Sequence, residues 1–155
     1  MNREILFRGK NKCEWVYGGF HKHLNTTPCV FSTEEERVRF FDENEKYVII
    51  NDILTDWNMP TKIDFKEIRK ETLGQYTGLK DKNGKKIFEG DIVRAKDSFF
   101  YNDGYYKIVY TKGGFMAEDK NESEEVTFGK DVSLDDFEVV GNIHDNPELL
   151  KGDIK

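Results

Sequence analysis

The sequence predicts a mainly β fold of antiparallel strands, with one short helix near residues 32–42 and a small SH3-like barrel in the C-terminal half. Large apolar side chains recur at every second position, as on one face of a strand. Aromatic and β-branched residues fill these runs, and the chain has 12 Phe and 7 Tyr. Pairs such as Asn83-Gly84 and Gly113-Gly114 separate the runs and supply the residues that tight hairpins require.

The N-terminal half contains most of the alternating pairs and the predicted helix. The pairs are Ile5 with Phe7, Trp15 with Tyr17, Tyr47 with Ile49, Ile63 with Phe65 and, further along, Ile108 with Tyr110. Ser32 and Glu35 have the spacing of a capping box and predict that a helix begins at Ser32. Val38 and Phe41 give this helix a short apolar stripe.

From Gly90 onward, four strands are predicted, at 91–96, 105–111, 114–118 and 137–142, the middle two forming a hairpin across Lys112-Gly113. Short antiparallel strands at this spacing are typical of a small SH3-like barrel, which its own side chains fill. Asn146 to Leu150, with Pro147 at the first helical position, predicts a short terminal turn of helix.

We expect one domain over residues 1–155, because this length suits a single core and no linker composition appears. Within it, 1–73 forms an N-terminal β-rich portion with the short helix, and 74–150 forms the barrel portion. The net charge of −6 is uneven: 74–96 holds 6 basic and 3 acidic residues, whereas 97–155 holds 6 basic and 14 acidic residues.

The overall acidity argues against general attraction to nucleic acid or to an anionic membrane. No apolar run approaches the roughly 18 residues that span a bilayer, and the first ten residues contain no signal-peptide apolar region. We therefore expect a soluble cytoplasmic protein with no membrane partner.

No catalytic, cofactor-binding or metal-binding residue is predicted. The sequence has no Gly-x-Ser-x-Gly elbow and no phosphate-binding glycine loop. Cys13, His21, His23 and Cys29 lack the close cysteine pair of structural zinc sites. Glu89 and Asp91 supply the carboxylates that a metal-dependent hydrolase would need, which leaves that activity as a second alternative hypothesis.

Three stretches carry a family resemblance. They are REILFRGK (3–10) followed by WVYGG (15–19), TLGQYTGLKDKNGKKIFEGDIV (72–93), and VVGNIHDNPELL (139–150). Together they resemble the YopX family of phage and prophage proteins. The resemblance implies a phage or prophage origin, a mainly β fold and self-association. It brings no established activity and so no site residues, and Phe88 and His144 stand where relatives commonly have tyrosine.

The middle stretch has two interpretations. Its glycines punctuate a hairpin with a turn at Asp81 to Gly84, and its apolar residues would then be core: Leu73, Tyr76, Leu79, Ile87, Phe88 and Ile92. Alternatively, four lysines would project from this hairpin beside Tyr76 and Phe88 as a basic patch that binds single-stranded nucleic acid: Lys80, Lys82, Lys85 and Lys86.

Aromatic residues cluster around one further predicted hairpin, at Phe99, Phe100, Tyr101, Tyr105 and Tyr106. They either alternate between core and cross-strand pairs or form an exposed edge that packs against another subunit. Trp57 is a second candidate interface residue, in a predicted loop.

The leading hypothesis is a phage- or prophage-encoded accessory protein that is not an enzyme. It would self-associate into a homo-oligomer and bind a host or phage protein. Nucleic-acid binding through the 80–86 hairpin is the first alternative.

Overall fold

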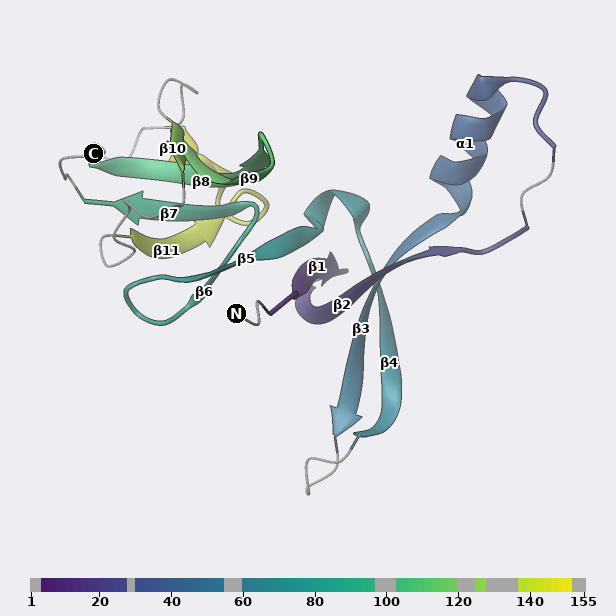
Figure 1. The fold of residues 1–155 in the computed structure, drawn as a ribbon, viewed down its shortest axis with the longest axis horizontal. Helices are drawn as coiled ribbons and strands as arrows, with labels where there is room; N and C mark the ends of the chain where they lie inside the picture. The colour runs from purple at the N-terminus through teal and green to yellow at the C-terminus, as the bar shows by residue number, and fades with distance from the viewer. Residues whose placement is uncertain are drawn as a thin grey trace. The chain divides into compact units, whose positions relative to one another are not determined.

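A computed structural model describes residues 4–27, 30–54, 60–96, 103–119, 125–127 and 137–151. The chain divides into two compact units. The N-terminal unit is Leu6–Leu73, and the C-terminal unit is Gly74–Lys155 together with Met1–Ile5. The division falls at Leu73/Gly74, where the sequence analysis separates its two portions. The predicted mainly β fold and single α-helix are confirmed (Figure 1).

The N-terminal unit contains four antiparallel strands in the order β4-β3-β2-β1. Their bounds are β1 Phe7–Asn11, β2 Glu14–Leu24, β3 Glu45–Leu54 and β4 Pro60–Ile68, followed by the 3₁₀ turn η1 Lys70–Thr72. The helix α1, Glu34–Asn44, joins β2 to β3 (Figure 1). The ends of the sheet approach each other, since Arg69 N–H donates to the Lys10 carbonyl over 3.0 Å.

Every second side chain of β1 to β4 points to the same side of the sheet, and we call this side the packed face. Phe20 stacks between Phe7 and Tyr47, each at a ring-centroid distance of 5.5 Å. Ile49 is 2% exposed and Ile68 is 6% exposed on the same face. Gly9 is required there, because a Cβ at this position would overlap the Ile68 side chain.

The C-terminal unit begins with the hairpin of β5 Gly74–Lys80 and β6 Lys86–Phe88. A second sheet follows in the order β10-β9-β8-β7-β11. Its strands are β7 Asp91–Ala95, β8 Gly104–Thr111, β9 Gly114–Asp119, β10 Glu125–Thr127 and β11 Phe137–Asn142, and the chain continues to the 3₁₀ turn η3 Pro147–Leu150.

These bounds confirm the strands predicted beyond Gly90, the hairpin across Lys112-Gly113 and the terminal turn that Pro147 begins. Lys112 and Gly113 both have positive φ, as the tight turn demands. The sheet order ends in β10 and β11, so the pairings within the described residues do not close into the expected barrel.

The core of the C-terminal unit joins the first hairpin to the sheet. Its buried side chains are Ile87, Val93, Ala95, Tyr106, Ile108, Phe115, Ala117, Phe137 and Val139, with Leu79 packed against them. Phe88 and Ile92 are also buried, and Tyr76 stacks on Phe88 at 5.4 Å. The prediction that the middle motif defines the fold is therefore confirmed for these residues, while Leu73 is half-buried.

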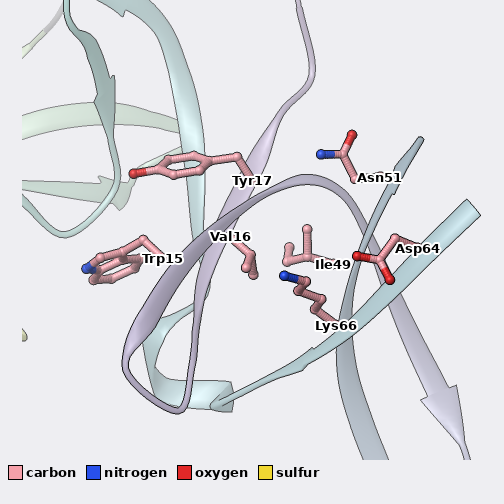
Figure 2. A pocket seen from close by; sticks show the side chains of 7 residues that line it. All are labelled: Trp15, Val16, Tyr17, Ile49, Asn51, Asp64 and Lys66. Carbon is pink, nitrogen blue, oxygen red and sulfur yellow. The ribbon is translucent and has the colours of Figure 1, made fainter. Parts of the chain in front are cut away.

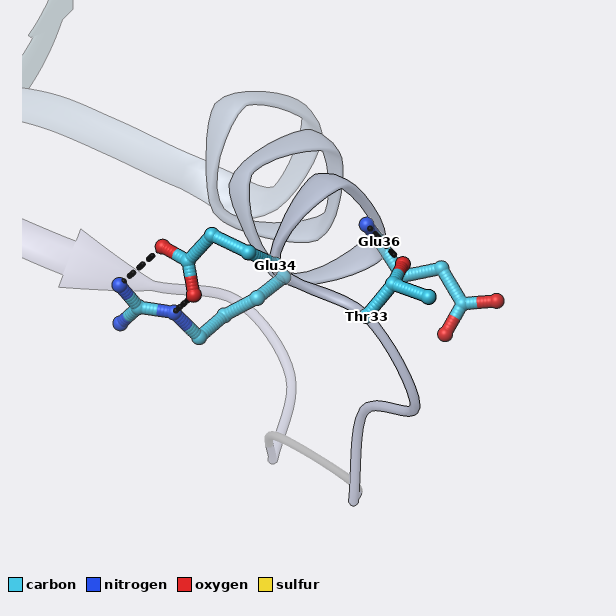
Figure 3. A network of polar contacts seen from close by, with 4 residues as sticks. Thr33, Glu34 and Glu36 are labelled. Atoms are coloured by element: carbon cyan, nitrogen blue, oxygen red, sulfur yellow. Dashed lines mark hydrogen bonds and ion pairs between the residues drawn. The ribbon is translucent and has the colours of Figure 1, made fainter.

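The N-cap of the helix lies one residue later than the capping prediction places it. Thr33, not Ser32, is the N-cap: its Oγ1 accepts from the Glu36 N–H over 3.2 Å (Figure 3). The Glu36 carboxylate in turn accepts from the Ser32 N–H over 3.0 Å, so both backbone N–H groups are satisfied. The predicted apolar stripe is not buried, since α1 contains no buried residue and Val38 is 51% exposed.

Candidate functional site

The predicted aromatic interface is only partly visible. Trp57, Phe99, Phe100 and Tyr101 lie outside the described residues. Tyr105 is half-buried, opposite Arg94 of β7. Tyr106 is 2% exposed and belongs to the core, because it pairs with Val93 and faces inward with Ile108. Tyr106 is therefore a core residue, as one of the two interpretations expected, and it is not part of an exposed interface.

The structure places the four candidate lysines on the β5–β6 hairpin, but two of them are neutralised. Lys82 Nζ lies 2.5 Å from Glu138 of β11. Lys86 Nζ lies 2.7 Å from Glu4 and 5.3 Å from the centroid of the Tyr76 ring. Lys80 and Lys85 are exposed. The hypothesis of phosphate binding by this patch thus depends mainly on two lysines.

Asp81 organises this hairpin from a buried position, with 6% of its surface exposed. One carboxylate oxygen accepts from the N–H groups of Asn83 and Lys85, each over 2.9 Å. The other accepts from the Val139 N–H of β11 over 3.0 Å. Burial alone would raise the pKa of Asp81, but these three hydrogen bonds outweigh it and lower the pKa below its ordinary value.

Glu89 and Asp91, the candidate carboxylates of a hydrolase, lie in or beside the turn between β6 and β7. Asp91 is 2% exposed, and its Oδ2 accepts from the Phe88 N–H over 2.8 Å. Glu89 is half-buried, and its carbonyl lies where a side chain at Gly74 would have to fit. Asp91 therefore stabilises the turn between β6 and β7.

The candidate zinc ligands are spread along the first hairpin. Cys13 lies exposed in the β1–β2 turn, and the rings of His21 and His23 lie 6.2 Å apart on β2. Cys29 lies outside the described residues. In the described part of the chain, no three metal-ligating side chains gather, and no helix is both long and apolar enough to cross a membrane.

The packed face of the N-terminal sheet contains a cavity of about 280 Å³. Two cross-strand pairs of β3 and β4 line it, Ile49 with Lys66 and Asn51 with Asp64. Trp15, Val16 and Tyr17 of β2 complete the lining (Figure 2). The lining combines apolar side chains with one carboxylate, Asp64, and one ammonium group, Lys66. Its residues do not include a nucleophile paired with a general base, so the lining suits binding more than covalent catalysis.

The opposite face of the same sheet contains exposed apolar residues among polar ones. We call its apolar residues the open face, and they comprise Val48, Ile50, Ile63 and Phe65. The register places Ile50 opposite Phe65, and it places Asp52 opposite Ile63 and Glu67 opposite Val48, so these residues share one side of the sheet. Phe65 is 63% exposed and Ile63 is 55% exposed.

Sequence reasoning missed this surface. The alternation of Ile63 with Phe65 was visible, but it does not say which strand lies beside β4 or whether another layer covers that face. Only the register between β3 and β4 brings the open face together.

A family model described as YopX protein matches residues 7–151. The chain belongs to the YopX protein family. The match extends across both units and includes the whole middle motif, so the resemblance expected from the three stretches is confirmed. No curated protein matches the sequence. Among solved structures, the chain is similar to protein EF1440 from Enterococcus faecalis, with 24% identity, coverage of 96% of this chain and 99% of that chain, and a TM-score of 0.48.

Proposed function

We propose that this YopX-family chain is a non-catalytic protein-binding module that self-associates, encoded by a phage or prophage and acting in the bacterial cytoplasm. The observation that supports self-association is the open face. The phage origin and the cellular location are extended from the family resemblance.

The N-terminal unit has little hydrophobic core of its own. Among the described residues of Leu6–Leu73, only Ile49 and Ile68 are buried hydrophobic side chains. A sheet normally buries its apolar face against another layer. The contiguous apolar residues of the open face are therefore the kind of surface that a second protein layer covers.

Phe65 makes the open face a good centre for such an interface. Aromatic side chains contribute large contact areas at low cost in conformational entropy, and they are enriched in interface cores. The half-buried Val48 and Ile50 lie on the neighbouring strand, with Ile50 directly opposite Phe65.

Sedimentation velocity at micromolar concentration tests this proposal. The wild-type protein is expected to sediment as an oligomer that dissociates on dilution, and Phe65→Ser should weaken it at least about tenfold. Tyr110→Ser is the matched control, because Tyr110 is a similarly exposed aromatic residue, 55% exposed, in the C-terminal unit. A wild-type protein that remains monomeric throughout would overturn the proposal.

A further inference from the structure

Strand β4 forms one end of the strand order β4-β3-β2-β1 and extends over nine residues, Pro60–Ile68. Only the end of its outer edge is occupied in the N-terminal unit. There the Glu67 carbonyl accepts from the Asn11 side chain over 2.7 Å, and Arg69 N–H donates to the Lys10 carbonyl. Residues 60–66 have no further strand beside them within the described part of this unit.

The backbone groups of Glu67 and Arg69 point away from β3 toward β1. Because the two backbone groups of every second residue in a strand point to the same side, those of Ile63 and Phe65 also point outward. Beyond Lys62 the pairing of β4 with β3 shifts register, so this alternation is not extended to Thr61 and Pro60. The uncovered segment thus offers the N–H and C=O groups of Ile63 and Phe65.

The charges beside this edge alternate in sign. Lys62, Asp64 and Lys66 lie on the packed-face side of β4, and Figure 2 shows Asp64 and Lys66 extending from the strand there. If a second β4 runs antiparallel across a two-fold axis at Ile63, Lys62 lies opposite Asp64 of the second copy, and Asp64 lies opposite its Lys62. Both cross-strand pairs then carry opposite charges, which is the favourable arrangement.

We propose that β4 pairs with β4 of a second copy of this chain, antiparallel and with Ile63 on the two-fold axis. The inference rests on the self-association proposed above and adds a strand-edge contact beside the open face. Ile63 forms a hydrogen-bonded pair with Ile63 of the second copy. The open faces of the two copies then lie on the same side of a sheet with four strands from each copy.

The sequence also selects against the neighbouring registers. An axis at Asp64 places Asp64 against itself and Lys62 against Lys66, so every facing pair of charged residues repels. An axis at Phe65 requires the outward groups of Glu67, and Asn11 already binds that carbonyl. In a two-fold pairing the β4 edges of both copies are occupied. Further copies therefore cannot add to this edge, as they can to an exposed edge strand.

Charge reversal with rescue tests this interface. Asp64→Lys places two lysines against each other twice and should raise the dimer dissociation constant at least about tenfold. The double variant Lys62→Asp with Asp64→Lys restores opposite charges and should return the constant to within about threefold of wild type. Lys66→Asp is the matched control, because Lys66 faces the uncharged Pro60 of the second copy in this register.

Sedimentation velocity in low salt, with circular dichroism to verify folding, separates the outcomes. A monomeric wild-type protein would overturn the proposed function itself. A wild-type oligomer that Asp64→Lys leaves unchanged, or that the double variant fails to restore, would overturn the β4 interface alone. A dimer weakened as strongly by Lys66→Asp as by Asp64→Lys would place the axis at Phe65 and contradict the proposed register.

Discussion

Asp81 shows how one side chain can connect distant parts of the C-terminal unit. Its carboxylate joins the 81–85 turn to β11, which lies 58 positions further along the chain. The Lys82 N–H donates to the Phe137 carbonyl over 3.2 Å and reinforces the same connection. The Asp-Lys-Asn-Gly turn is therefore a structural element, with Gly84 at φ +80° completing the turn.

Asp81→Asn should destabilise the protein by about 1–3 kcal/mol at neutral pH. Both carboxylate oxygens of Asp81 accept hydrogen bonds, whereas the NH₂ group of asparagine cannot accept one, so at least one backbone N–H loses its partner. The sign of the pH dependence follows from the lowered pKa of Asp81. The stabilisation by Asp81 is complete when the pH is above the pKa of this group in the unfolded chain, about 4. It is lost as the pH falls through the lower pKa of the folded protein. Urea unfolding of both proteins at pH 7 and near pH 3 measures this difference.

Asp52→Asn is the control for that experiment, since Asp52 is exposed. It should change the free energy of unfolding by less than about 0.5 kcal/mol at either pH. A wild-type advantage over Asp81→Asn that grows in acid would contradict the assignment.

At the scale of an element, α1 depends on its own ends more than on packing. It has no buried residue, and its 11 residues are close to the lower limit for a stable isolated helix. The Thr33 cap and the bidentate Arg37–Glu34 pair, at 2.6 and 2.9 Å, support its first turn (Figure 3). The Arg37 side chain lowers the pKa of the Glu34 carboxylate through its hydrogen bonds.

Thr33→Ala should therefore reduce the helical circular-dichroism signal, because losing the cap costs about 1 kcal/mol of helix stability. Ser32→Ala is the matched control: only the backbone N–H of Ser32 contacts Glu36, and alanine keeps that bond. If both substitutions reduced the helical signal equally, Thr33 would not be the functional cap.

The start of α1 could be predicted from the sequence only approximately. The capping motif located the helix to within two residues, because a cap is a local interaction. The capping-box spacing assigned the cap to Ser32, whereas the backbone geometry selects Thr33, whose φ of −134° and ψ of 158° orient its hydroxyl toward Glu36.

Across the whole molecule, the hydrophobic core is unevenly divided. Among the described residues, the C-terminal unit buries nine apolar side chains in one cluster, whereas the N-terminal unit buries Ile49 and Ile68. Because apolar burial is the main favourable term in folding, the two units should differ in local stability.

Hydrogen exchange measured by mass spectrometry should show this difference. At low protein concentration, amides of β7 and β8, including those of Val93 and Ile108, should exchange at least about tenfold more slowly than those of β3 and β4. Protection of β4 should then rise with concentration as self-association covers it. Equal protection of both units in dilute solution would contradict the uneven core.

The sequence by itself determined four of the strands between 91 and 142, the hairpin turns and the family, because alternation, turn glycines and motifs are encoded by neighbouring residues. Only the tertiary structure decided what the candidate residues do. Lys86 meets Glu4 across 82 positions, and Tyr106 turns into the core. The open face likewise exists only because the register sets Phe65 beside Ile50, and register depends on pairing between strands that local sequence does not specify.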